Sequence, residues 1–305
     1  MGLSMFLVIL CHTPNVGLKL LRVFPAGLIG TDVFIFLSGY SLCYAIGKYP
    51  LKTFYFRRIV RIYPMFFILA VFMSLLNIYN GESISIMDWL SNLSFASFYV
   101  GGAGFAIDWY LSVCVLLYLL FPLLYKHMNL WLLIILTVLS FLFQIAYSFN
   151  YLGIEMIGDV RAAGYARVPM FCWGIFLYKE IITNGGNGGF DKIWIYSFWI
   201  AIFLLSIFFK LHFFWLTDLI APFLIVALLI LCKKIICYSN VRRYIDVLGK
   251  YSIEIYIANF IATKVCVLLP HNYLLLLIYA ILTYLMTLVF IPYNRIIMRY
   301  MSKII

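Results

Sequence analysis

The stretch "GTDVFIFLSGYSL", residues 30–42, combines a long apolar run with groups that lipid does not solvate. Most of its side chains suit a hydrocarbon environment, but Asp32, Ser38, Gly39 and Tyr40 add a charge, two hydroxyls and a bare backbone. Polar groups within a membrane are rare, and they face protein or a water-filled cavity rather than lipid. The segment therefore raises the question of what its polar residues face.

The composition of the whole chain is that of a membrane protein. Of its 305 residues, 66% are hydrophobic and 11% are charged, and the mean hydropathy is +1.06. A soluble domain is nearer half apolar and a quarter charged. The apolar segments leave room for about ten spans of about 20 residues, and runs such as Leu130 to Ile135 lack the alternation of a barrel strand. We predict an all-α, polytopic membrane helical bundle in a single domain, 1–305.

The basic residues predict the orientation of the spans. We place spans near 2–15, 28–47, 62–79, 109–125, 130–148, 168–183, 193–209, 215–232, 251–269 and 273–293. With a cytoplasmic amino terminus, the inner loops and tail hold 16 of the 22 Lys and Arg residues. Short cytoplasmic loops are rich in Lys and Arg, so both termini are predicted to be cytoplasmic and the chain to cross an inner or plasma membrane many times.

Several other features carry no chemistry of their own. The net charge of +11 comes from residues between spans, so nucleic acid is not an expected partner. The seven Cys residues form no CxxC pair and no Cys/His ligand spacing, which favours packing and predicts no metal site. The glycine-rich stretches 101–104 and 184–189 lack the Lys-Ser/Thr of a phosphate loop.

His12 ends the first predicted span, in "MGLSMFLVILCHTPN". An imidazole close to hydrocarbon is costly unless it faces the protein interior, so His12 is a candidate general base. Asp32, which opens the second span, is a plausible partner that would orient or charge the imidazole. The alternative is that His12 only completes a hydrogen-bond network between helices.

The stretch "FYFRRIVRIYP", residues 54–64, carries Arg57, Arg58 and Arg61 at helical spacing. Guanidinium groups bind phosphate through two parallel hydrogen bonds, so this cluster could bind a phosphorylated donor. The alternative is an anchor to lipid headgroups. Pro64 is expected in the first turns of the third span, where it would set the start of the helix.

Three later segments carry polar residues with weaker signals. Trp109, in "DWYLSV", is expected at the outer interface, and Arg167, in "YARVPMFCWGI", reads as an interfacial anchor. Glu254 and Asn259 lie within the ninth span, where polar groups either join helices or line a cavity.

Taken in order, these motifs resemble the acyltransferase-3 family of integral membrane O-acyltransferases. The resemblance rests on the His ending the first span, "GTDVFIFLSGY", "RRIVRIYP", "DWYLSV", "RVPMFCWGI" and "LGKYSIEIYI", and it covers nearly the whole chain. It implies transfer of an acyl group, usually acetyl, from cytoplasmic acyl-CoA to a hydroxyl of an envelope or surface glycan or of its lipid-linked precursor. The acyl-CoA would be a co-substrate, and no permanently bound cofactor is expected.

The resemblance also implies roles for individual residues. His12 matches the catalytic histidine, with Asp32 beside it, and Arg58 and Arg61, with Arg57, match the arginines that handle the donor. The remaining candidates belong to channel and motif positions, and they are Ser38, Gly39, Tyr40, Trp109, Ser112, Arg167 and Glu254. The polar residues of 30–42 would then face a donor channel, which answers the question raised by that stretch.

The chain departs from the family pattern at three places. The family's arginine, eleven residues before the histidine, corresponds to Met1. Either the first helix is truncated at its amino terminus, which its short length favours, or this arginine is absent. At the positions where one branch of the family has paired Glu residues, this chain has Cys114 and Val115. At the position where the ninth-span motif can end in His, this chain has Asn259. Two alternatives to the transferase therefore stay open: a membrane transporter or permease, and a truncated, inactive family member.

Overall fold

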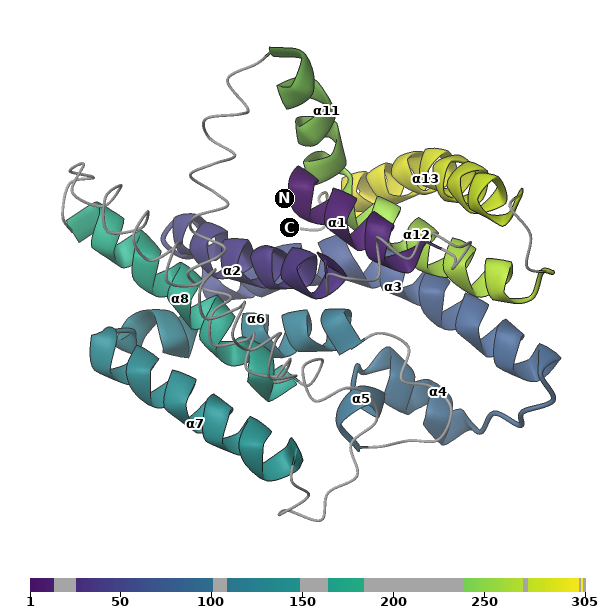
Figure 1. The fold of residues 1–305 in the computed structure, drawn as a ribbon. Coiled ribbons are helices and arrows are strands. Elements are labelled where there is room, and N and C mark those ends of the chain that lie inside the picture. Colours follow the sequence, from purple (N-terminus) through teal and green to yellow (C-terminus); the bar gives the residue numbers. More distant parts are fainter. Residues whose placement is uncertain are drawn as a thin grey trace, which may run out of the picture. The chain divides into compact units, whose positions relative to one another are not determined.

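The computed structural model describes residues 1–13, 26–100, 109–148, 164–183, 239–270, 274–301 and 303 (Figure 1). All regular secondary structure within these ranges is helical, which confirms the all-α prediction. The helices are α1 (Gly2–His12), α2 (Ala26–Ile46), α3 (Leu51–Tyr79), α4 (Ile86–Leu93), α5 (Ser97–Val100), α6 (Trp109–His127), α7 (Leu130–Ser148), α8 (Gly164–Thr183), α11 (Ser239–Lys250), α12 (Ser252–Val267) and α13 (Leu274–Met301).

Three of these helices, α3, α6 and α13, are long and apolar enough to cross a membrane. Gly30–Ile46 of α2 and Leu130–Phe143 of α7 are shorter apolar helices. The backbone in lipid must satisfy its own hydrogen bonds, which a helix does within one segment. The protein is therefore a membrane protein. The predicted spans 193–209 and 215–232 lie outside the described residues, and the ten-span count and the orientation stay predictions.

The start of α3 differs from the prediction. The helix begins at Leu51 rather than near residue 62, and Pro64 lies inside it. A proline within a helix removes the bond to the carbonyl four residues earlier, here that of Val60, but it need not end the helix. Phe54, Val60 and Pro64 are all buried, so packing continues across the proline. The expectation that Pro64 sets the start of this helix was wrong.

The chain divides into two compact units, each assembled from separate segments. The first consists of Met1–Thr31, Leu51–Leu111 and Arg243–Ile305, and the second of Asp32–Pro50 and Ser112–Arg242. In the first unit α12 packs against α1, α3 and α13, and α13 also packs against α3. In the second unit α7 packs against α8. The single-domain assignment stays a prediction.

Three helices, α4, α5 and α11, lie where the sequence predicted loops. The short helix α4 begins with a capping box, in which Ser85 Oγ accepts from the Asp88 amide and the Asp88 carboxylate accepts from the Ser85 amide. The side-chain and backbone hydrogen bonds from Ser85 lower the pKa of Asp88.

Helix α11 contacts the start of α1, where a Cβ on Gly2 would lie 1.9 Å from the Ile245 carbonyl oxygen.

Candidate functional site

The predicted site residues fall into two groups. The first unit contains His12, Arg57, Arg58, Arg61, Trp109 and Glu254, and the second contains Asp32, Ser38, Gly39, Tyr40, Ser112 and Arg167. The predicted base and the predicted donor-binding arginines therefore belong to one compact unit. The proposed pairing of His12 with Asp32 stays a prediction, because the two residues belong to different units.

The end of α1 holds the His12 imidazole in one tautomer. Nδ1 lies 2.9 Å from the carbonyl oxygen of Val8, one turn earlier on the same helix. A carbonyl only accepts, so Nδ1 carries the proton and donates it, and the lone pair of the neutral ring lies on Nε2. Within the described residues no hydrogen bond to Nε2 is formed. The ring is half-buried, and Nε2 with its lone pair can act as a proton acceptor.

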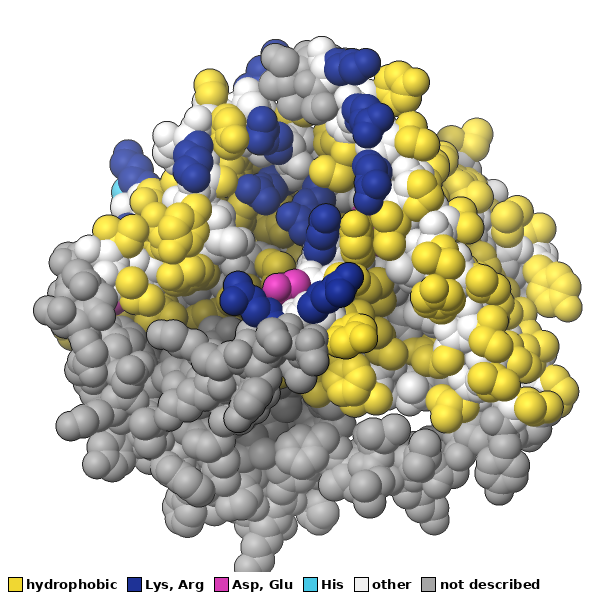
Figure 2. All heavy atoms as spheres, turned by 90° about the horizontal axis from the view of Figure 1, so that it is seen from above, with side chains coloured by type: hydrophobic (Ala, Val, Ile, Leu, Met, Phe, Trp, Pro, Cys, Tyr) yellow, Lys and Arg dark blue, Asp and Glu magenta, His cyan; other side chains and the backbone are white. Residues whose placement is uncertain are grey.

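The three arginines of α3 differ in their surroundings. Arg58 is half-buried, and its guanidinium carbon lies 5.5 Å from the centroid of the Phe54 ring. Arg57 and Arg61 are exposed. Figure 2 shows Lys and Arg side chains at the surface, and exposed positive charges of this kind attract anions. The helical spacing of the cluster is confirmed, because residues 57–61 all lie within α3.

A buried ion pair joins α2 to α8. Arg167 Nη1 lies 2.9 Å from Asp32 Oδ1, and the two side chains are 0% and 3% exposed. Transfer of each charge from water into the protein interior costs several kcal/mol, and the attraction between the two charges must offset this cost. The interpretation of Arg167 as an interfacial anchor was therefore wrong, since an anchor would keep its charge in contact with water or headgroups.

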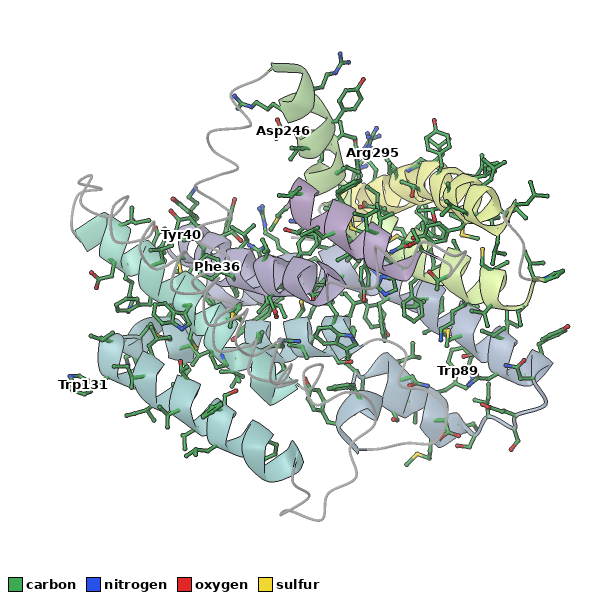
Figure 3. The ribbon with its side chains drawn as sticks, in the orientation of Figure 1. Phe36, Tyr40, Trp89, Trp131, Asp246 and Arg295 are labelled. Atoms are coloured by element: carbon green, nitrogen blue, oxygen red, sulfur yellow. The ribbon has the colours of Figure 1, made fainter. Side chains whose placement is uncertain are left out.

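The same two helices approach each other closely at two glycines. A Cβ on Gly39 would lie 2.2 Å from the Phe171 carbonyl oxygen, and one on Gly174 would lie 2.1 Å from the Phe36 carbonyl oxygen. Only glycine allows the backbones to pass at this distance. Phe36 and Tyr40 lie one turn apart on α2 (Figure 3). Gly39 thus serves helix packing, whether or not a channel lies nearby.

Ser38 and Tyr40 have side-chain partners in the second unit. The Tyr118 hydroxyl on α6 donates to Ser38 Oγ over 3.4 Å. The Tyr40 ring packs edge-on against Tyr44 and Tyr178, at centroid distances of 5.7 and 5.5 Å. These contacts account structurally for both residues, and their predicted role in a channel stays a prediction.

The remaining candidates are half-buried or buried. Trp109 is half-buried at the start of α6, and its neighbour Tyr110 packs against Tyr256 of α12 at 5.3 Å. Ser112 is 4% exposed. Glu254 is 7% exposed, and its Oε1 accepts a hydrogen bond of 2.7 Å from Asn294 of α13. Glu254 therefore joins α12 to α13, one of the two roles expected for it.

The described ranges contain no group of three or more His, Cys, Asp or Glu placed to hold a metal ion. Sequence reasoning missed two residues that touch α1. Tyr279 donates to the Ile9 carbonyl, and Thr263 donates to the His12 carbonyl. No local motif signals these contacts, because each joins residues more than 250 positions apart.

These observations define a helical membrane protein with a histidine and buried polar pairs within apolar helices. The model of the family described as "Acyltransferase domain" matches residues 2–295. The chain belongs to this acyltransferase family, and the resemblance seen in its motifs is confirmed. The protein is thus a membrane acyltransferase. Comparisons with curated proteins and with solved structures gave no match.

Proposed function

We propose that the protein is a multi-pass O-acyltransferase of the inner or plasma membrane. It moves an acyl group, acetyl in the simplest case, from cytoplasmic acyl-CoA to a hydroxyl of an envelope glycan or of its lipid-linked precursor. Family membership supports acyl transfer over the alternative of a transporter. The observation that carries the proposal further is the tautomer of His12, which leaves Nε2 ready to accept a proton.

His12 acts as the general base. Nε2 removes the proton of the acceptor hydroxyl while the hydroxyl oxygen attacks the thioester carbonyl carbon. The new carbon–oxygen bond forms, the carbon–sulfur bond breaks, and the imidazolium returns its proton to the departing CoA thiolate. The products are the acyl ester and CoA, and no group remains on the enzyme. The bond from Nδ1 to Val8 keeps Nε2 as the reacting nitrogen throughout.

Arg58 and Arg61 bind the phosphates of the donor, with Arg57 beside them. All three lie on α3, in the unit that contains His12, and α12 contacts both α1 and α3. Guanidinium groups hold phosphate oxygens by charge-assisted hydrogen bonds, which fixes the donor without taking part in the chemistry. Their loss should therefore weaken donor binding more than it slows the transfer.

The test is transfer of labelled acetyl from acetyl-CoA to envelope glycan in membranes that contain the protein. His12→Ala is expected to lower kcat by about 100-fold or more, because a positioned base contributes at least that factor. Arg58→Ala is expected to raise KM for acetyl-CoA by about tenfold, as expected for a lost hydrogen bond to a charged group. The product should release its label in mild base, as an ester does.

Matched controls are His127→Ala and Arg243→Ala, because both side chains are exposed and belong to no proposed site. Both should transfer at the wild-type rate when protein levels are matched. Wild-type rates in His12→Ala would remove the proposed base. An absence of base-labile label in wild-type membranes supplied with donor and glycan would contradict O-acylation of glycans and favour the inactive family member.

A further inference from the structure

The last turn of α1, which carries His12, is held by side chains from distant helices. A helix leaves its last four carbonyl oxygens without partners inside the helix. Here the Tyr279 hydroxyl of α13 donates to the Ile9 carbonyl over 3.0 Å. The Thr263 hydroxyl of α12 lies 3.2 Å from the His12 carbonyl oxygen and 2.8 Å from the Asn259 carbonyl oxygen of its own helix, so the two acceptors share its one proton. Thr13 donates to the Leu10 carbonyl over 2.7 Å. Side-chain hydroxyls thus lie within hydrogen-bond distance of three of the last four carbonyls of α1.

Such bonds determine where the end of α1 lies. In a low-dielectric environment, a carbonyl without a partner costs several kcal/mol, so the helix end settles where donors reach it. Tyr279 is 2% exposed and belongs to a core with Ala262, Cys266 and Leu275, against which Ile9 also packs. Packing in this core therefore fixes the position of the Tyr279 ring and of its hydroxyl. The bond to Ile9 joins α1 to that core.

Asn259 completes the arrangement from α12. Its side-chain amide is 0% exposed and in hydrogen-bond contact with the Tyr279 hydroxyl. A tyrosine hydroxyl has one proton, and Ile9 offers only an acceptor. Asn259 Oδ1 is a second acceptor at the same hydroxyl, so the single Tyr279 proton lies between the Ile9 carbonyl and Asn259 Oδ1. The Tyr279 hydroxyl of α13 therefore contacts both α12 and the end of α1.

We propose that Tyr279 is a positioning residue for His12, with Asn259 and Thr263 supporting the same helix end. The proposal rests on the proposed function of His12 as base. The bond from His12 Nδ1 to Val8 sets the orientation of the ring on α1, and the bond from Tyr279 to Ile9 sets the place of α1 in the unit. Nε2 reaches the acceptor hydroxyl only when both are in place.

The experiment compares Tyr279→Phe with Tyr284→Phe, which removes an exposed hydroxyl from the same helix. Tyr279→Phe is expected to lower kcat by about tenfold or more while KM for acetyl-CoA stays within about twofold, because a misplaced base slows the chemistry without weakening donor binding. Tyr284→Phe should match wild type. An equal kcat in the two variants, or a change confined to KM, would overturn the proposal.

A second readout does not depend on turnover. Diethyl pyrocarbonate modifies neutral imidazoles, and mass spectrometry of the His12 peptide gives the rate of that reaction. Tyr279→Phe should increase the rate at His12 by about threefold or more, since loosening the helix end exposes the ring, and should leave His127 unchanged. An unchanged rate at His12 would overturn positioning. If wild type transfers no acyl group, the proposed function fails, and this rate still decides the role of Tyr279.

If Tyr279→Phe does not accumulate in membranes, Thr263 decides the question. Thr263→Val removes the donor to the His12 carbonyl, and Thr263→Ser keeps it. The control is Thr287→Val, because the Thr287 hydroxyl donates to the Thr283 carbonyl of its own helix, as that of Thr263 does to Asn259. Low kcat in Thr263→Val with recovery in Thr263→Ser supports the proposal. Equal kcat in all three variants overturns it.

Discussion

Replacing Arg167 with methionine is expected to lower the free energy of unfolding by about 3 to 5 kcal/mol, because the substitution leaves a buried carboxylate without its counter-charge. Asp32 and Arg167 are almost completely buried, and Nη1 and Oδ1 are 2.9 Å apart. Methionine is an unbranched, flexible apolar side chain that fills irregular space, so the effect reports charge more than volume. Thermal unfolding of the purified protein in one fixed detergent measures it.

A double variant and a surface variant make this prediction specific. Asp32→Leu combined with Arg167→Met removes both charges and should recover much of the lost stability, as replacement of a whole buried pair by apolar residues often does. Arg243→Met, an exposed position on α11, should change stability by less than about 0.5 kcal/mol. A loss below about 1 kcal/mol for Arg167→Met would mean that the pair is weak, as exposed pairs are.

Adding one methyl group at Gly39 or Gly174 is expected to force α2 and α8 apart. The new Cβ would lie 2.2 Å from the Phe171 carbonyl oxygen in Gly39→Ala, and 2.1 Å from the Phe36 carbonyl oxygen in Gly174→Ala. Neither neighbour is a flexible side chain that can turn away. Each variant should lose about 1 to 3 kcal/mol, the usual cost of overpacking, and valine at either position should cost more.

Gly47→Ala is the matched control, because a Cβ at Gly47 would meet nothing within 4 Å. Thermal unfolding in the same detergent should order the variants as wild type and Gly47→Ala first, the two close-contact alanines next and their valine counterparts last. Wild-type stability in Gly39→Ala and Gly174→Ala would show that the two helices are farther apart in the membrane than these contacts require.

The sequence motifs correctly predicted that the candidate residues lie on helices. Their errors concerned where helices begin and which short helices exist. Arg57, Arg58 and Arg61 share one helix, as their spacing predicted. The helix start predicted from Pro64 was wrong, because the buried face of α3 continues on both sides of the proline. Helices α4, α5 and α11 were missed, since they are too short or too polar to produce an apolar run of membrane length.

The partners of the polar residues could not be predicted. The ion pair of Asp32 is with Arg167, 135 positions along the chain. Tyr279 was not a candidate, and it bonds Ile9 across 270 positions. Helical periodicity predicts which residues share one face of a helix. It does not predict which other helix packs against that face, so it cannot predict the partner of a buried polar group.

The sequence by itself determined that the chain is a helical membrane protein, because contact with lipid requires an apolar surface and the backbone in lipid requires helices. Its motifs also determined that it belongs to an acyltransferase family. It also determined which residues could carry chemistry, since polar groups are rare among so many apolar ones. Only the tertiary structure decided their partners. It pairs Asp32 with Arg167, and it places donors at the end of α1, because close packing between helices selects which buried groups can satisfy each other.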